Sequence, residues 1–202
     1  MSFRAKMLPF TLQKKKQMIW FFTPYSFNKK LFEAIDQYMN LVANPEDWVF
    51  IADGDTAFLR SDFGHQIKNY IEKYPDTGLF TCYASRCHNS RQVRKGTEMN
   101  NPNIIYHKNR AEETYKLFDG QIKEINHRIS GHLWGIQKKT WVKICPEVAK
   151  KVVTQDKKIL GVDTKISNAI MNHGLKIRLM RGMYIFHYLR LVEGFNSTKH
   201  LQ

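Results

Sequence analysis

The segment that decides the fold reads Asp47-Trp48-Val49-Phe50-Ile51-Ala52-Asp53-Gly54-Asp55-Thr56-Ala57-Phe58-Leu59. Its apolar run contains aromatic and β-branched residues without polar alternation, which is typical of a strand that is buried on both faces. In open α/β sheets, ligands bind beyond the carboxyl ends of such strands. Because this run ends in two closely spaced aspartates, the sequence predicts a ligand site at the end of the strand.

The chemistry of that site follows from the spacing of Asp53 and Asp55. Residues two apart point the same way in an extended backbone, and Gly54 between them lets the backbone approach a ligand closely. Two carboxylates this close repel each other unless a proton or a cation lies between them. We therefore expect a hard divalent cation that also carries phosphate oxygens. The alternative is a plain hairpin, because Asp-Gly flanked by apolar residues is also the strongest signal for a two-residue turn.

The composition indicates a folded protein that attracts anions. The chain has 202 residues, of which 43% are hydrophobic and 13% aromatic, enough for one domain with a sizeable core. Its formal net charge of +14 favours partners such as nucleotide phosphates, nucleic acid, acidic lipid headgroups or acidic glycans. The lysines are scattered in doublets and one triplet rather than gathered in one block, so we regard a specific role in nucleic-acid binding as the less favoured interpretation.

The cysteines and the apolar segments favour a cytoplasmic protein. Cys82, Cys87 and Cys145 cannot all pair with one another, and their spacing matches no zinc pattern. A reduced compartment is the simplest account of such a set. No apolar stretch has the length of a membrane span, and residues 1–16 lack the pattern of a secretory signal. We expect residues 1–16 to form an N-terminal arm or edge segment, and residues 17–202 to form one α/β domain.

Hydrophobic periodicity predicts a chain of alternating strands and helices. A strand at 17–23, a helix at 29–42 capped by Asn28 and the strand at 48–52 form a strand–helix–strand unit, which predicts parallel pairing. Further helices are expected at 63–74, 111–125, 139–144 and 164–172, and further strands at 79–83, 131–136, 175–180 and 183–186. We therefore expect a central, mostly parallel sheet flanked by helices.

Segment 85–103 is polar, basic and rich in asparagine, and we interpret it as a long loop. Long loops inside compact domains are usually functional or mobile. The guanidinium group matches phosphate oxygens, so the basic side chains of this loop either clamp phosphates or lie in solvent. These side chains are Arg86, Arg91, Arg94 and Lys95.

The order of these segments resembles that of glycosyltransferases of the GT-A fold, which use nucleotide sugars. That family has a nucleotide-contacting segment after its first strand, a buried strand ending in Asp-x-Asp and a glycine-containing acceptor loop. An acidic residue then opens a helix that leads to a strand of the form Gly-Leu-Lys-Ile, and a late histidine follows an apolar strand. The matching stretches are Phe22-Thr23-Pro24-Tyr25, Ile51-Ala52-Asp53-Gly54-Asp55, Ser130-Gly131-His132-Leu133-Trp134-Gly135, Gly161-Val162-Asp163-Thr164-Lys165-Ile166-Ser167, Asn172-His173-Gly174-Leu175-Lys176-Ile177 and Tyr184-Ile185-Phe186-His187-Tyr188. The resemblance runs from about Gln17 to Arg190. The acidic motif is often Glu-Asp in the family and is Val162-Asp163 here.

The resemblance implies a Rossmann-like GT-A domain with a metal centre. Asp53, Asp55 and His187 would be the metal ligands, and Asp53 would also face the ribose of the nucleotide. The ion would be Mn²⁺ or Mg²⁺, and imidazole suits Mn²⁺ better because Mg²⁺ prefers a shell of oxygens. The alternative for His187 is a structural histidine that is hydrogen-bonded at the end of a strand.

The resemblance also implies where the substrates bind. Thr23, Pro24 and Tyr25 would contact the nucleotide, with Tyr25 stacking on a uracil or guanine base. The acceptor or donor sugar would be contacted by Gly131, His132 and Trp134. The partners would be a UDP- or GDP-linked sugar and an acceptor that is a glycan, a lipid-linked molecule or a protein, with a peripheral membrane contact among the options. Tyr25 and His132 also have plain structural alternatives, as a turn aromatic and as a polar loop end.

Asp163 is the candidate catalytic residue. It precedes the predicted helix at 164–172, where a carboxylate also serves as a simple N-cap. The resemblance implies that Asp163 faces the acceptor hydroxyl and takes its proton, as an enzyme that inverts the anomeric carbon requires. The residues by themselves leave both roles open.

Two other functions compete with glycosyl transfer. A nucleic-acid-binding or nuclease-like protein would use Asp53 and Asp55 as a metal pair and its lysine doublets on phosphates, although a two-metal site normally needs further carboxylates. A noncatalytic module of the same fold would bind a nucleotide as a regulator. Nucleotide binding with and without Mn²⁺, compared with binding to DNA and RNA, distinguishes the first of these from glycosyl transfer.

Overall fold

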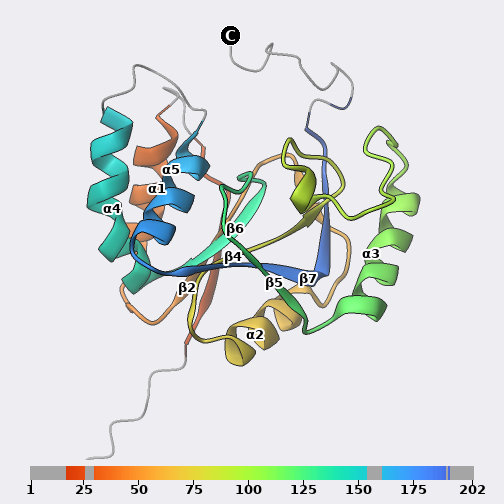
Figure 1. The fold of residues 1–202 in the computed structure, drawn as a ribbon, viewed down its shortest axis with the longest axis horizontal. Coiled ribbons are helices and arrows are strands. Elements are labelled where there is room, and N and C mark those ends of the chain that lie inside the picture. Colours follow the sequence, from red (N-terminus) through yellow and green to blue (C-terminus); the bar gives the residue numbers. More distant parts are fainter. Residues whose placement is uncertain (1–16, 26–29, 154–160, 190, 192–202) are drawn as a thin grey trace, which may run out of the picture.

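The structure is a computed structural model that describes residues 17–25, 30–153, 161–189 and 191. Its central element is one mixed sheet of seven strands (Figure 1). The strands are β1 (Ile19–Phe22), β2 (Trp48–Ala52), β3 (Thr56–Phe58), β4 (Thr77–Ala84), β5 (Ile122–Ile125), β6 (Leu133–Gln137) and β7 (Lys176–His187). The helices are α1 (Leu31–Leu41), α2 (Phe63–Lys73), α3 (Ile104–Phe118), α4 (Lys138–Val153) and α5 (Val162–Asn172), with a short 3-10 helix, η1 (Ser90–Gln92). The strand order is β1-β2-β6-β4-β7-β3, and β5 also pairs with β7.

The directions of the strands confirm one prediction and correct another. β1 and β2 pair in parallel, as expected for the first strand–helix–strand unit. The expectation of a mostly parallel sheet is wrong, because β6 lies antiparallel between β2 and β4, and β3 and β5 are antiparallel to β7. The direction of β6 depends on its pairing with strands that are distant in the sequence, and the local sequence pattern does not report that pairing. As a result, β1, β2, β4 and β7 run one way and the other three strands run against them.

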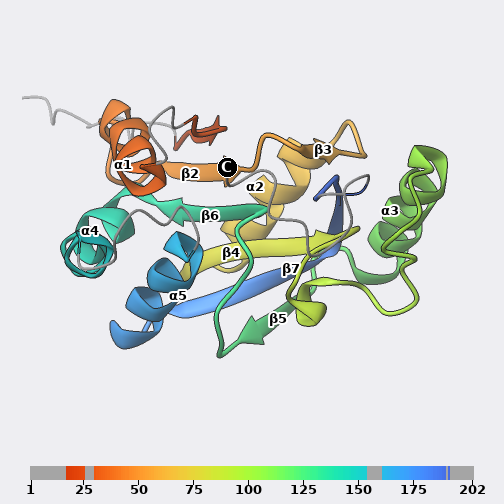
Figure 2. The same ribbon diagram turned by 90° about the horizontal axis from the view of Figure 1, so that it is seen from above.

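Helices cover both faces of the sheet (Figures 1 and 2). α1, α4 and α5 pack on one face, where the inward side chains of β2 are Val49 and Ile51. α2 packs on the opposite face, against Trp48 and Phe50. This two-sided burial is why β2 shows no polar alternation. Gly135 of β6 lies opposite Phe50, and a Cβ at that glycine would lie 2.3 Å from the phenyl ring, so the close packing of these strands requires a glycine.

Several segments differ from the elements predicted from the sequence: β3 was not expected, and α4 is longer than the helix expected at 139–144. The helix expected at 111–125 is α3, which starts earlier because the side chain of Asn103 accepts hydrogen bonds from the backbone N–H groups of Ile105 and Tyr106. Its predicted last turn is instead β5. The two strands expected at 175–180 and 183–186 are one strand, β7, whose pairing with β4 is irregular in the middle. The predicted arm at 1–16 and the predicted cap Asn28 lie outside the described residues.

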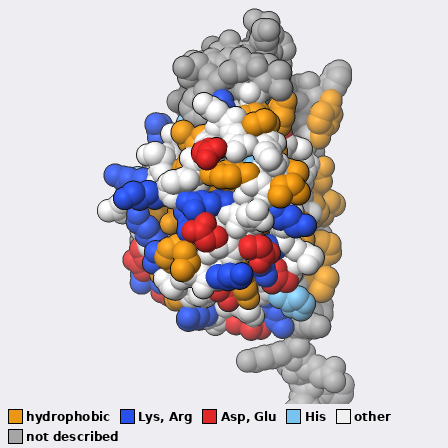
Figure 3. Space-filling model, turned by 90° about the vertical axis from the view of Figure 1, so that its right-hand side faces the viewer, with side chains coloured by type: hydrophobic (Ala, Val, Ile, Leu, Met, Phe, Trp, Pro, Cys, Tyr) orange, Lys and Arg blue, Asp and Glu red, His pale blue; other side chains and the backbone are white. Residues whose placement is uncertain are grey.

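The surface and the thiols give three further findings. On the face shown in Figure 3, basic, acidic and apolar side chains are intermingled rather than sorted into one block. In the part of the chain that the structure describes, no helix combines the length and apolar character of a membrane span. Cys82, Cys87 and Cys145 are free, and burial raises the pKa of all three thiols.

Candidate metal centre

The site lies at the edge of the sheet where the four co-directional strands end and β6 begins. Asp53 and Asp55 follow β2, and His187 is the last residue of β7. The Asp-Gly sequence does not form a hairpin, because β2 pairs with β1 and β6 whereas β3 pairs with β7. The chain turns at Asp53, whose carbonyl accepts from the N–H of Thr56 at 3.2 Å. This turn leads into β3, in which Thr56 lies opposite His187.

Asp53, Asp55 and His187 converge at this edge, as the sequence analysis expected. One ligand atom from each lies within 4.8 Å of the others. Nε2 of His187 is 3.2 Å from Oδ1 of Asp55 and 3.7 Å from Oδ2 of Asp53. The side chain of His187 is only 4% exposed, whereas those of Asp53 and Asp55 are 49% and 41% exposed. The imidazole therefore approaches the cluster from the interior, and the carboxylates leave its outer side open to solvent.

The orientation of His187 is fixed by the loop that follows β4. Nδ1 of His187 lies 2.7 Å from the carbonyl oxygen of Arg86, and the backbone N–H of His187 donates to Oγ of Ser85 at 2.9 Å. A carbonyl oxygen only accepts, so Nδ1 carries the proton and donates it. In the neutral ring the lone pair of Nε2 then faces the two carboxylates. Three electron-rich atoms that face one another fit a bound cation, and a carbonyl partner on the far nitrogen is typical of metal-binding histidines.

The two carboxylates differ in their electrostatics. Burial raises the pKa of Asp53 to about 6; His187 opposes the rise, while the charges of Asp55 and Asp163 add to it. Burial acts in the same direction on Asp55, but in the protonated form of His187 the Nε2–H bond and the positive charge outweigh burial and lower the pKa of that carboxyl; in the neutral ring a bound cation would take this place. Oδ2 of Asp55 also accepts from the N–H of Leu189 at 3.1 Å. The site thus carries unrelieved negative charge on Asp53, which an additional cation would relieve.

His132 and Trp134, expected at a sugar, lie in the interior. His132 is fully buried, its Nε2 donates to the carbonyl of Cys82 at 3.1 Å, and burial lowers its pKa to about 3. Its ring lies 5.6 Å from that of His187, and its carbonyl accepts from the N–H of Asp53 at 3.1 Å, so it supports the cluster from behind. Trp134 is 3% exposed and stacks on Trp141 in the core. Neither side chain offers a surface to a sugar in this conformation.

Asp163 lies in the first turn of α5, close enough to the cluster for its charge to act on Asp53. The N-cap residue of this helix is Gly161, so Asp163 does not serve as the N-cap, which was its alternative role. The Asp163 carboxylate accepts hydrogen bonds from the backbone of Thr164 and of Gly131, and burial raises its pKa. A Cβ at Gly131 would lie 3.4 Å from the Cβ of Asp163, which places the expected base and the expected sugar-contacting glycine side by side.

The segment expected at the nucleotide reaches the same edge. A Cβ on Gly54 would lie 3.6 Å from the methyl group of Thr23, because β1 and β2 end together. Gly54 does not have a positive φ, so its backbone conformation does not require a glycine. Its lack of a side chain leaves open space at this edge. Pro24 is half-buried, and Tyr25 is 76% exposed, with its ring accessible to a planar base.

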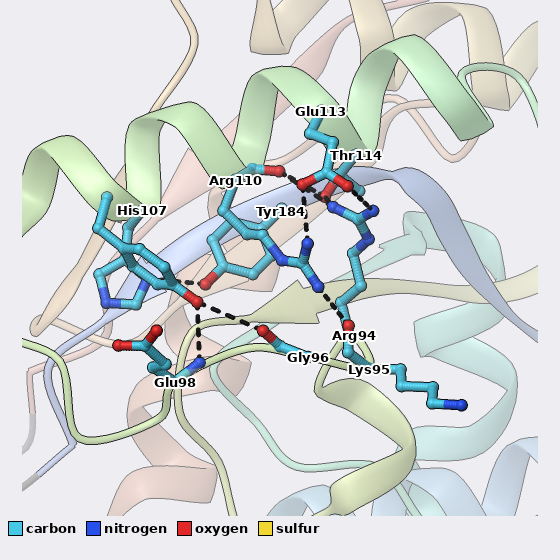
Figure 4. A network of polar contacts seen from close by, with 10 residues as sticks. Arg94, Lys95, Gly96, Glu98, His107, Arg110, Glu113, Thr114 and Tyr184 are labelled. Carbon is cyan, nitrogen blue, oxygen red and sulfur yellow. Dashed lines mark hydrogen bonds and ion pairs between the residues drawn. The ribbon is translucent and has the colours of Figure 1, made fainter.

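The basic residues of the 85–103 loop divide into two groups. Arg91 and Lys95 are exposed, whereas Arg86 and Arg94 are buried and used inside the protein. Figure 4 shows the guanidinium groups of Arg94 and Arg110 converging on the carboxylate of Glu113, which fastens the loop to α3. The hypothesis that Arg86 and Arg94 clamp phosphates is therefore not supported.

The supporting roles of Ser85, Arg86 and Leu189 are not predicted from the sequence. One signal was available for the first two, since polar residues directly after β4 lie at the edge where the other strands end.

No protein-family model matches the chain, and no protein of curated function matches it. Among the described residues, Asp53, Asp55 and His187 form the one group of His, Cys, Asp and Glu side chains close enough together to hold a metal ion. The function is therefore inferred from this geometry.

Proposed function

We propose that this protein is a metal-dependent glycosyltransferase of the GT-A type, which moves a sugar from a nucleoside-diphosphate donor to an acceptor hydroxyl. The observation that carries the proposal is the convergence of Asp53, Asp55 and His187, with the Nε2 lone pair directed at both carboxylates. These residues come from two distant segments of the chain and meet at the carboxyl edge of the sheet, where ligands of α/β proteins bind.

The donor set favours Mn²⁺ over Mg²⁺. It offers carboxylate oxygens and one imidazole nitrogen, and imidazole is a poor ligand for Mg²⁺. The open outer side of the cluster leaves coordination positions for the oxygens of a diphosphate. Bound there, the cation would act as a Lewis acid that neutralises charge on the departing nucleoside diphosphate.

The nucleotide and the acceptor contact different residues around the cluster in this proposal. The exposed ring of Tyr25 stacks on the base, and Thr23 and Pro24 line the same side, with Asp53 beside the ribose. Gly131 and Asp163 form the acceptor side. A carboxylate with a raised pKa is suited to take a proton, and the backbone N–H of Gly131 orients Asp163 for that role. Of the three residues expected at the sugar, Gly131 is the one that keeps this role.

A thermal-shift panel tests the proposal. Uridine and guanosine diphosphate should each be measured with and without Mn²⁺, beside single- and double-stranded oligonucleotides, on the wild type and on Asp55→Asn. The proposal expects a shift with one diphosphate that depends on Mn²⁺ and is lost in the variant. A shift with oligonucleotides alone would favour the nuclease-like alternative instead.

Catalysis needs a separate measurement. Release of the nucleoside diphosphate from a panel of nucleotide sugars, with water or simple sugars as acceptors, distinguishes an enzyme from a noncatalytic nucleotide-binding module. The proposal expects release that requires Mn²⁺ and Asp55. Tight binding of the diphosphate without release from any donor would favour the noncatalytic module.

A further inference from the structure

Arg86 touches the candidate metal centre with both its backbone and its side chain. It is the second residue after β4 and is 2% exposed. Its carbonyl oxygen accepts the Nδ1–H of His187 at 2.7 Å. Its Nε donates to the carbonyl oxygen of Leu189 at 2.8 Å. One residue therefore contacts both the histidine of the cluster and the turn that follows it.

The turn at Leu189 is the second support of the cluster. The N–H of Leu189 donates to Oδ2 of Asp55, while its carbonyl oxygen accepts from Arg86. The N–H of Tyr188 donates to the carbonyl oxygen of Asp55 at 2.9 Å. Leu189 also has a positive φ of 21°, which L residues rarely adopt and which neighbouring contacts must hold in place. The bond from Arg86 is one such contact, so the position of Asp55 depends on it.

The guanidinium also holds the far end of its own loop. Nη1 of Arg86 donates to the carbonyl oxygen of Met99 at 3.1 Å and to the side chain of Asn100. With the Arg86 side chain fixed at both the loop end and the Leu189 turn, the direction of its own carbonyl is fixed as well. That carbonyl selects the tautomer of His187 that leaves Nε2 free for a ligand.

We propose that Arg86 is a positioning residue for this centre, which sets the direction of the His187 ring and the place of the Asp55 carboxylate. The inference rests on the proposed function, because it concerns the same metal cluster. Residues that orient metal ligands typically change metal affinity by 10–100-fold when they are lost. The guanidinium of Arg86 is bonded inside the protein and is not directed at a phosphate in solvent.

Arg94 provides a matched control. It belongs to the same loop, is 8% exposed, and donates to Oγ1 of Thr114 at 2.9 Å and to Glu113 at 2.7 Å. These partners lie on α3 and not in the cluster. Replacing Arg94 with methionine removes a buried guanidinium and loosens the loop, as the same change does at Arg86. A purely structural role would make the two variants behave alike.

The test compares Arg86→Met with Arg94→Met by two measurements, each at a temperature where the variant is folded by circular dichroism. The first titrates the full chain with Mn²⁺ alone and follows free Mn²⁺ by electron paramagnetic resonance. We expect Mn²⁺ affinity to fall about 10–100-fold in Arg86→Met and to stay within about twofold of wild type in Arg94→Met.

The second measurement needs no metal. Nitrogen-15 NMR of histidine-labelled protein reports which ring nitrogen of His187 carries the proton, with the resonance assigned from its absence in His187→Gln. We expect the Nδ1–H form in the wild type and in Arg94→Met, and a mixture of the two forms in Arg86→Met. If Arg86→Met does not fold, Arg86→Lys replaces it, since an ammonium lacks the planar fork that reaches both carbonyls, and a fall in Mn²⁺ affinity of about fivefold or more is expected.

The outcomes separate this inference from the proposed function. A folded Arg86 variant with wild-type Mn²⁺ affinity and a pure Nδ1–H form of His187 would overturn the positioning role and leave the metal site intact. A wild-type protein that does not bind Mn²⁺ would count against the proposed function, and the tautomer measurement would still decide the role of Arg86.

Discussion

The two ends of β7 each carry a cluster of acidic side chains, and the clusters are neutralised in different ways. At the first end, Arg178 and Lys176 both pair with Asp76 and Glu124. The hydrogen bond from Arg178 holds the pKa of Asp76 well below its usual range. At the last end, Asp53 and Asp55 face His187, and the pKa of Asp53 is raised to about 6.

The difference distinguishes a structural cluster from one that is suited to a ligand. In the first cluster, Arg178 and Lys176 neutralise the carboxylates, and the side chain of Arg178 is 5% exposed. This cluster is therefore neutralised without an added metal ion. The last cluster combines two carboxylates with the lone pair of a histidine whose proton is held on the other nitrogen. Acidic residues that are raised in pKa and open to solvent are candidates for function, whereas those lowered by a buried arginine are candidates for stability.

The largest expected effect concerns Asp163. Asp163→Asn should lower turnover by about 10²–10⁴, because a general base contributes that much, while the Mn²⁺-dependent affinity for the nucleotide is retained. Asparagine keeps one side-chain oxygen, which can accept from the N–H of Thr164 as Oδ1 of Asp163 does, so this contact at the start of α5 is preserved. The measurement is steady-state release of nucleoside diphosphate beside a thermal shift. Turnover within about threefold of wild type would show that the base lies elsewhere or that the enzyme retains configuration.

The next effect concerns the metal itself. In the wild type, a nucleoside diphosphate and Mn²⁺ at about a hundred times the dissociation constant should add about 2.7 kcal/mol to the free energy of unfolding. Asp55→Asn should remove most of this gain, since it removes a ligand and the partner of His187. Chemical unfolding with and without the ligands measures both values. An unchanged gain in the variant would separate Asp55 from the metal.

A smaller effect concerns Asp53 and pH. Its pKa rises on folding from an ordinary value of 3.8 to about 6, so the folded protein keeps this proton at pH values where the unfolded chain has released it. Stability is therefore lost as pH rises from about 4 to about 6, and the loss persists above that range. The full pKa shift would correspond to a loss of about 3 kcal/mol in the free energy of unfolding. Because the carboxylate is half-exposed, solvent screening reduces the expected loss to about 1 kcal/mol.

Asp53→Asn should remove that loss. In the absence of metal, the variant should be more stable than wild type by about 1 kcal/mol at pH 8, and the difference should vanish near pH 4. Urea unfolding at the two pH values measures the difference. A variant that is less stable than wild type at pH 8 would mean that the Asp53 charge is already compensated in the protein.

The smallest effect is expected at the other end of β7. Asp76→Asn should leave the Mn²⁺-dependent stabilisation by nucleotide unchanged, because Arg178 and Lys176 neutralise that cluster already. The same thermal-shift panel supplies the measurement. A loss of the metal response comparable to that of Asp55→Asn would remove the distinction between the two ends of the strand.

The sequence was informative where the signal is local. The parallel β1–α1–β2 unit follows from its periodicity. Asp53 and Asp55 do approach each other, but through the turn from Asp53 to Thr56 and not through the extended backbone that their spacing suggested. The meeting of these residues with His187 was expected from the resemblance, and the structure brings the three together. The metal-binding role of the cluster stays a prediction.

The sequence was uninformative where the position of a residue depends on pairing between distant strands. β6 pairs with β2 and β4 in the middle of a sheet that helices cover on both faces, and this position carries Trp134, and His132 directly before β6, into the interior. A short apolar run gives no hint of such a central position. The support of His187 by Arg86 also depends on pairing between β4 and β7, which brings two distant segments to one edge.

Anomalous diffraction at the manganese edge, from crystals grown with Mn²⁺ and a nucleoside diphosphate, would locate the metal itself. We expect one strong manganese peak within bonding distance, roughly 2 Å, of the carboxylates of Asp53 and Asp55 and of Nε2 of His187. We expect no peak at Asp76 and Glu124. Manganese at the Asp76 end, or none beside His187 while the diphosphate is bound, would show that Asp53, Asp55 and His187 do not form the metal centre.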